Sequence, residues 1–180
     1  MFKHTFLKTV STLAVTLSVA FAGTGSTTES GEAQRTLQTL KQSANNVQVA
    51  SEKLHTFATN SIVSNATRAS LLDTIQTRIN QMGRDMASLQ ADRSHLNVWE
   101  QKAIDQALPL LRDAATNTEQ VIGYFNDRHD SVWAGEYRDS AARISRDTEK
   151  IATTIGEALK LSKLQLEEQQ TKADLGVSGF

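Results

Sequence analysis

The sequence predicts an all-α protein, an up-down-up-down antiparallel four-helix bundle with coiled-coil-like packing. Three observations support this prediction. Four segments carry apolar residues at alternating spacings of three and four, the period of a helix face packed against other helices. Only one proline and nine glycines occur in 180 residues. Polar loops of about five to eight residues between the segments favour antiparallel neighbours. A three-helix bundle with one long bent helix is the alternative.

Residues 1–22 are expected to form a secretory signal peptide. Lys3 and Lys8 precede a mainly apolar run, and Ala20 and Ala22 supply the small residues that signal peptidase accepts before Gly23. The run is too short and too rich in Ser and Thr for a transmembrane helix. We therefore expect an exported bacterial protein, periplasmic or secreted, with no stable membrane insertion after processing. A retained membrane anchor is the alternative.

The helical bundle domain is predicted over residues 31–170, after a flexible lead-in at 23–30 that is rich in Gly, Ser and Thr. Ser30 is expected to cap the first helix, which ends near Asn60. The predicted core positions of this helix are Ala33, Leu37, Leu40, Ala44, Val47, Ser51, Leu54 and Ala58. Those of the second helix, which ends before Asp92, are Ala69, Leu72, Ile75, Ile79, Met82, Met86 and Leu89.

The third helix is predicted to start with a capping box, in which Asn97 and Glu100 each bond the other's backbone N–H. Pro109 lies inside this helix and is expected to kink it, because proline removes one backbone hydrogen bond. The predicted core positions are Ile104, Leu108, Leu111, Ala115, Thr118, Ile122 and Phe125. The fourth helix is predicted from about residue 134 to 170, with core positions Tyr137, Ala141, Ile144, Thr148, Ile151, Ile155 and Ala158. Residues 171–180 are expected to be a flexible C-terminal tail.

Composition limits the classes of function. Removing residues 1–22 takes away two lysines and no acidic residue, which leaves 17 basic and 20 acidic residues and a net charge of −3. A mildly acidic chain without a basic stripe lacks the positive charge that binding to nucleic-acid phosphates requires. The sequence has no cysteine, which excludes disulfides, Cys-bound zinc and covalently attached c-type haem. We expect no nucleic-acid partner and no cofactor.

Aromatic residues are expected to gather at one end of the bundle, where the first and third loops meet. Phe57, Tyr124, Trp133 and Tyr137 are the candidate ligand-binding residues of this cluster, with Phe125 beside them. The same rings would equally plug the end of the bundle, and we prefer that interpretation because large aromatic side chains mostly serve packing.

A metal site at the same end is the second alternative. Glu52 and His55 form an E-x-x-H step, which di-iron bundles carry on two helices, but the heptad register places this pair outward or along a flank. His55 and His129 are the candidate ligands of a weak divalent metal site with Asp127 and Asp130. Solvated side chains in a loop are the preferred explanation. No catalytic residues are assigned, because no nucleophile–base arrangement is recognisable.

The segment from Trp99 to Tyr137 resembles a set of exported helical bacterial proteins of unknown function. The residues that carry the resemblance are Trp99, Pro109-Leu110-Leu111, Asn117, Ile122, Asn126 and Glu136-Tyr137. The resemblance implies a secreted or periplasmic helical domain and no assigned catalysis.

We therefore expect an exported non-enzymatic helical bundle that acts through protein or envelope contacts. Its protein partner is not identified, and a homo-oligomer is one arrangement that the sequence allows. A small-molecule- or metal-binding bundle with its site at the aromatic end is the alternative function.

Overall fold

The computed structural model describes residues 26–60, 62–127 and 135–175. Within these ranges the chain forms four α-helices and no strand. They are α1 (Ser26–Phe57), α2 (Asn65–Ala91), α3 (Val98–Asp127) and α4 (Gly135–Asp174), with a short 3₁₀ helix, η1 (Arg93–His95), between α2 and α3. The predicted signal peptide at 1–22 lies outside the described residues.

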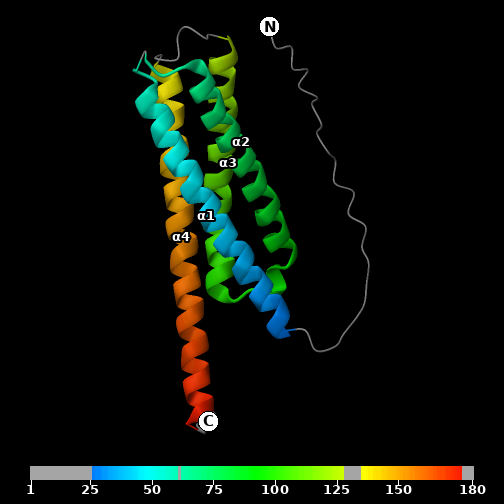
Figure 1. The fold of residues 1–180 in the computed structure, drawn as a ribbon. Helices are drawn as coiled ribbons and strands as arrows, with labels where there is room; N and C mark the ends of the chain where they lie inside the picture. Colours follow the sequence, from blue (N-terminus) through cyan, green and yellow to red (C-terminus); the bar gives the residue numbers. More distant parts are fainter. Residues whose placement is uncertain (1–25, 61, 128–134, 176–180) are drawn as a thin grey trace.

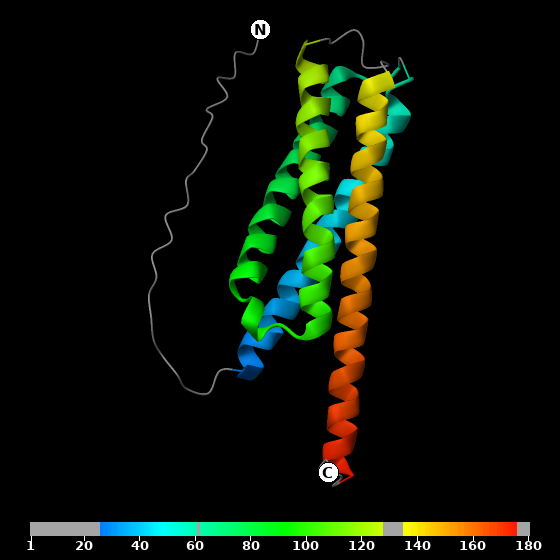
Figure 2. The same cartoon turned by 180° about the vertical axis from the view of Figure 1, so that it is seen from behind.

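The four helices form the predicted up-down-up-down bundle. Each packs against its neighbour in the chain, and α1 also packs along α4. Figures 1 and 2 show α1 crossing the bundle at a tilt: it ends beside α4 at the upper end of Figure 1 and begins nearer to α2 at the lower end. The four-helix arrangement is confirmed, and the three-helix alternative is wrong.

Two predicted boundaries are wrong. Helix α1 begins at Ser26, so residues 26–30 are helical and do not form a flexible lead-in, and Ser30 is not the cap. Helix α4 continues to Asp174, so residues 171–174 are helical too. Both errors have one physical cause. Extending an existing helix costs far less than nucleating one, so polar residues at its ends join it.

The predicted core of α1 and α4 is confirmed, because all fifteen positions named for these two helices are buried. In α2 the first predicted position is wrong. Ala69 is exposed, and Arg68 is buried in its place. The observed positions 68, 72, 75, 79, 82, 86 and 89 keep the alternating spacing without a break.

The predicted core of α3 is half correct. Ile104, Leu111, Thr118 and Phe125 are buried, whereas Leu108, Ala115 and Ile122 are only partly buried. The residues one position earlier, Ala107, Ala114 and Val121, are buried in their place. Small side chains face the interior there because α3 packs closely along α4. Pro109 lies inside α3 with its side chain exposed.

The lower connection, between α2 and α3, is fixed by a capping box and an ion pair. Asn97 Oδ1 accepts hydrogen bonds from the Trp99 and Glu100 backbone N–H groups, and Glu100 Oε2 accepts from Asn97 N, each at 3.0 Å. The predicted capping box is therefore confirmed. Arg93 donates two hydrogen bonds of 2.8 Å to the Asp105 carboxylate, which holds η1 against α3 and lowers the pKa of Asp105.

Candidate functional site

Of the four predicted aromatic residues at the upper end of the bundle, the structure describes three. Tyr137 is completely buried and belongs to the core. Phe57 is half-buried at the end of α1, and Tyr124 is half-buried on α3. Trp133, like His129 and Asp130, lies outside the described residues. Tyr137 thus packs as the plugging interpretation requires, and the aromatic ligand site stays a prediction.

Arg68 organises this end of the molecule, and the sequence reasoning missed it. Its guanidinium donates to the Phe57 and Asn60 carbonyl oxygens, at 2.9 and 2.7 Å, and to Asn65 Oδ1 at 3.2 Å. The two carbonyls belong to the C-terminal end of α1 and the turn after it, where a cation is favoured by the helix dipole. Arg68 therefore ties the end of α1 to the start of α2. The signal that could have found it was the unbroken 68–72–75 spacing.

Burial also changes the chemistry of Tyr137. Removal of the ring from water raises the pKa of its hydroxyl well above the usual range, and the positive charge of Arg68 opposes this shift only in part. The phenol stays neutral at physiological pH. Among the described residues, its hydroxyl has no hydrogen-bond partner. A neutral, completely buried phenol serves packing here.

His55 faces α4 along the flank of the bundle, one of the two directions that the register predicted. Its ring Nδ1 lies 3.1 Å from the Arg138 carbonyl oxygen. Because a carbonyl only accepts, Nδ1 must carry the proton and donate. Glu52, one turn earlier, accepts a 3.4 Å hydrogen bond from Ser145 of α4. The E-x-x-H pair therefore joins α1 to α4.

Asp127, the other predicted metal ligand that the structure describes, lies in a different groove from His55. Asp127 lines a groove between α3 and α4, with Tyr124, Glu136, Asp139 and Arg143. His55 contacts α4 from the α1 side. In the part of the chain that the structure describes, no three His, Asp or Glu side chains converge as a metal site requires. The metal alternative, which also needs His129, stays a prediction.

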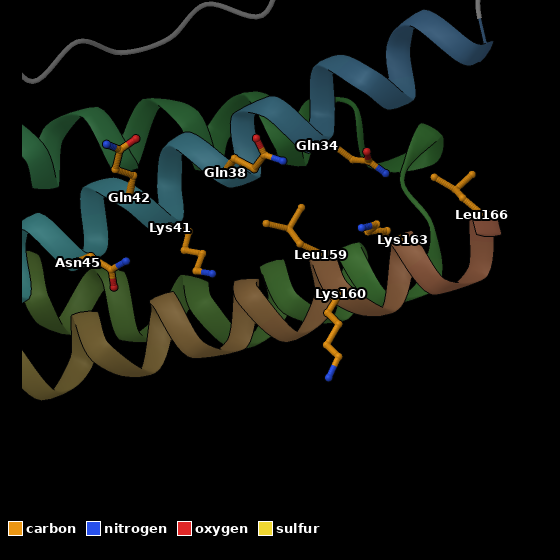
Figure 3. A pocket seen from close by; sticks show the side chains of 9 residues that line it. All are labelled: Gln34, Gln38, Lys41, Gln42, Asn45, Leu159, Lys160, Lys163 and Leu166. Carbon is orange, nitrogen blue, oxygen red and sulfur yellow. The ribbon is translucent and has the colours of Figure 1, made fainter. Parts of the chain in front are cut away.

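A groove lies between α1 and α4 in the lower half of the bundle, where the two helices diverge (Figure 3). We call it the α1/α4 groove. Its volume is about 600 Å³. In Figure 3, Lys41 points from α1 toward α4, Leu159 points from α4 toward α1, and Lys160 points away from the groove. The lining residues are Gln34, Gln38, Lys41, Gln42, Asn45, Leu159, Lys160, Lys163 and Leu166.

Helix α4 continues past the rest of the bundle at this end. Ser162 is its last buried residue, and its hydroxyl accepts a 2.9 Å hydrogen bond from Asn97 Nδ2 at the start of α3. Residues 163–174, which we call the overhang, are all exposed. Lys163 and Leu166 still lie beside α1 in Figure 3, and the end of α4 projects below the other helices in Figures 1 and 2. About half of the surface of Leu164 and of Leu166 is accessible to water.

The overhang carries its own ion pairs. Lys163 Nζ lies 3.6 Å from Glu167 Oε1, and Lys172 Nζ lies 2.7 Å from Glu168 Oε1, both one turn apart. Such exposed pairs stabilise a helix only by a few tenths of a kcal/mol each. They help to keep the overhang helical but bury none of its leucines.

No family model matches the chain, and neither a curated protein nor a solved structure shows significant similarity. None of the described helices is long and apolar enough to cross a membrane.

Proposed function

We propose that the protein is exported and acts without catalysis, by binding another protein through the overhang and the adjoining α1/α4 groove. The observation that carries the proposal is the overhang itself. It is the last twelve residues of α4, it carries two half-exposed leucines, and none of its side chains is buried.

The overhang extends an existing helix, so it forms at little cost, but its leucines stay half exposed to water. Most helix stability in proteins comes from packing one apolar face. A partner that lies along the overhang would bury Leu164 or Leu166 and extend the packing that ends at Ser162. Amphipathic helices bind in grooves between helices by this means.

Two further observations support a role without catalysis. Three buried hydroxyls are engaged with their own helices: Ser51, Thr118 and Thr148 each donate to the carbonyl four residues earlier, at 2.7–2.8 Å. His55 uses its Nδ1 proton on a backbone carbonyl of α4. These groups serve structure.

The proposal of export depends on the sequence of residues 1–22 and on the resemblance to exported helical proteins. The resemblance begins at Trp99, whose ring is partly exposed at the lower end of α3, close to Leu161 of α4 across a shallow groove.

The test is site-specific crosslinking in the producing cell. A photoreactive amino acid replaces Leu166 in one strain and Arg78, an exposed residue of α2, in the control strain. We expect illumination to yield one defined protein adduct from position 166 and none from position 78. The crosslinked protein, once purified, should bind the intact chain and fail to bind a chain that ends at Gln165. Absence of an adduct at 166, or equal adducts at both positions, contradicts the proposal.

A further inference from the structure

The α1/α4 groove is basic, although the chain as a whole is slightly acidic. Its lining contains three lysines, four side-chain amides and two leucines, and no carboxylate. Ammonium and amide N–H groups both donate hydrogen bonds. The groove therefore suits a helix that carries acidic side chains beside a few apolar ones.

The tip of the overhang is acidic. Its last eight residues contain Glu167, Glu168 and Asp174 against the single cation Lys172, which pairs with Glu168. Its length matches as well. The overhang spans twelve residues, 163–174, and the part of α1 that lines the groove also spans twelve, Gln34 to Asn45. At 1.5 Å per residue each is about 18 Å long.

The spacing of residues on α4 supplies a register. Leu159, Lys163, Leu166 and Gln170 recur at intervals of four, three and four, so they form one face of the helix, and the first three line the groove. Lys160 and Glu167 stand seven residues apart and therefore lie on the same edge of this face.

We infer that the protein pairs with a second copy of itself through α4, with the two overhangs antiparallel and the acidic tip of each against the α1/α4 groove of the other. Antiparallel pairing places Lys160 of each copy opposite Glu167 of the other, and Lys163 opposite Leu166. The interface is self-complementary, as a two-fold dimer requires. Lys160 lies at the outer edge of its own groove, on α4, where it can reach a second copy that lies along α4. The inference rests on the proposed function and identifies the partner.

The first test exchanges charges across the expected pair. Sedimentation velocity over a range of concentrations should show a monomer–dimer equilibrium. Lys160→Glu and Glu167→Lys should each weaken the dimer about tenfold or more, because each places like charges opposite one another. The combined variant should regain the dimer, because it restores both pairs in reversed order. Arg78→Glu, on α2 and away from the groove, is the matched control and should dimerise normally.

The second test examines the register directly. Because the sequence has no cysteine, each introduced cysteine is the only thiol of its chain. Lys163→Cys and Leu166→Cys proteins are mixed and oxidised. The mixture should form a disulfide-linked dimer faster than either variant alone, because the expected register brings positions 163 and 166 of the two copies together. A mixture of Arg78→Cys with either variant should crosslink slowly.

The outcomes separate this inference from the proposed function. Pairing through α4 is contradicted if the protein is monomeric at every concentration. It is also contradicted if neither charge reversal changes the monomer–dimer equilibrium. If the crosslinker at Leu166 then captures a different protein that requires the overhang, the proposed function remains and only the second copy is rejected. If neither a dimer nor an adduct forms, both are rejected.

Discussion

At the scale of single residues, Arg68 shows how a charge can occupy a core position. It is 3% exposed, yet the Nη2 nitrogen of its guanidinium donates to two backbone carbonyls, so these protein acceptors replace lost water. Hydrogen bonds from charged donors each contribute about 1.5–3 kcal/mol, more than those of neutral groups.

Arg68→Ala is expected to lower the free energy of unfolding by about 2–4 kcal/mol, because it leaves the carbonyls of Phe57 and Asn60 without this donor. Urea denaturation followed by circular dichroism measures the change. Ala69→Ser, at the neighbouring exposed position, should change stability by less than about 0.5 kcal/mol. If the two substitutions have equal effects, the position of Arg68 in the core is wrong.

Asp147 and Asp105 should respond to pH with opposite signs. Burial, and then the charge of Asp113 across the α3–α4 interface, raise the pKa of Asp147 against the opposing charges of Lys150, Arg146 and Arg143. A raised pKa in the folded state means that Asp147 contributes most below about pH 4, its unfolded value, and that this contribution is lost as pH rises through the folded pKa. For Asp105, whose pKa is lowered, the contribution is present above about pH 4 and is lost as pH falls through the folded pKa.

Asp147→Asn should therefore be more stable than the parent protein at pH 7 and equal to it near pH 3. Asp105→Asn should be less stable at pH 7, because it loses the ion pair with Arg93, and should also converge with the parent at low pH. Thermal unfolding at several pH values distinguishes the two. A stability difference of the same sign in both variants at pH 7 contradicts these assignments.

At the scale of helices, the apolar period predicted which elements form but not every buried face. In α3 the larger residues Leu108 and Ile122 suggested the core face, and Ala107 and Val121 occupy it instead. Both choices have helical spacing, so only the tight packing of α3 against α4 decides between them. Arg68 was missed for a similar reason. A charged side chain is not expected at a core position, and the carbonyl oxygens that accept its hydrogen bonds belong to α1 and the turn after it, which the sequence of α2 does not show.

Leu111 tests the part of the α3 register on which sequence and structure agree. It is buried, two residues after Pro109. Leu111→Ala should cost about 2–5 kcal/mol of stability, because it removes a buried side chain and leaves a cavity. Lys102→Ala, exposed on the same helix, should cost less than about 0.5 kcal/mol. Chemical denaturation compares them, and small effects from both variants would require a new register for α3.

At the scale of the whole molecule, the bundle and the overhang should be separable. No residue after Ser162 is buried in the part of α4 that is described, so the bundle does not depend on the overhang for its core. The sequence predicted a helix to Gln170, but it could not show that the other three helices stop short of it. The α1/α4 groove was unpredictable for the same reason, because it arises from the tilt between two helices.

Ending the chain at Gln165 should leave the melting temperature of dilute protein unchanged within about 2 °C. The same truncation should abolish self-association, because Leu166 and Glu167 are removed. Differential scanning calorimetry and sedimentation velocity measure the two properties. A large loss of stability at low concentration would show that the overhang belongs to the folding unit.

The hydrogen bond between Asn97 and Ser162 also has a mechanical meaning. A pulling force on the end of α4 travels along the helix axis, and Ser162 is the first residue at which another element can resist it. Because α4 lies between α1 and α3, the load is shared as shear along both neighbours. At 1.5 Å per residue the overhang is a spacer of about 18 Å. Whatever is attached to its tip is held at a fixed distance from the bundle, and force on that attachment is carried into the start of α3.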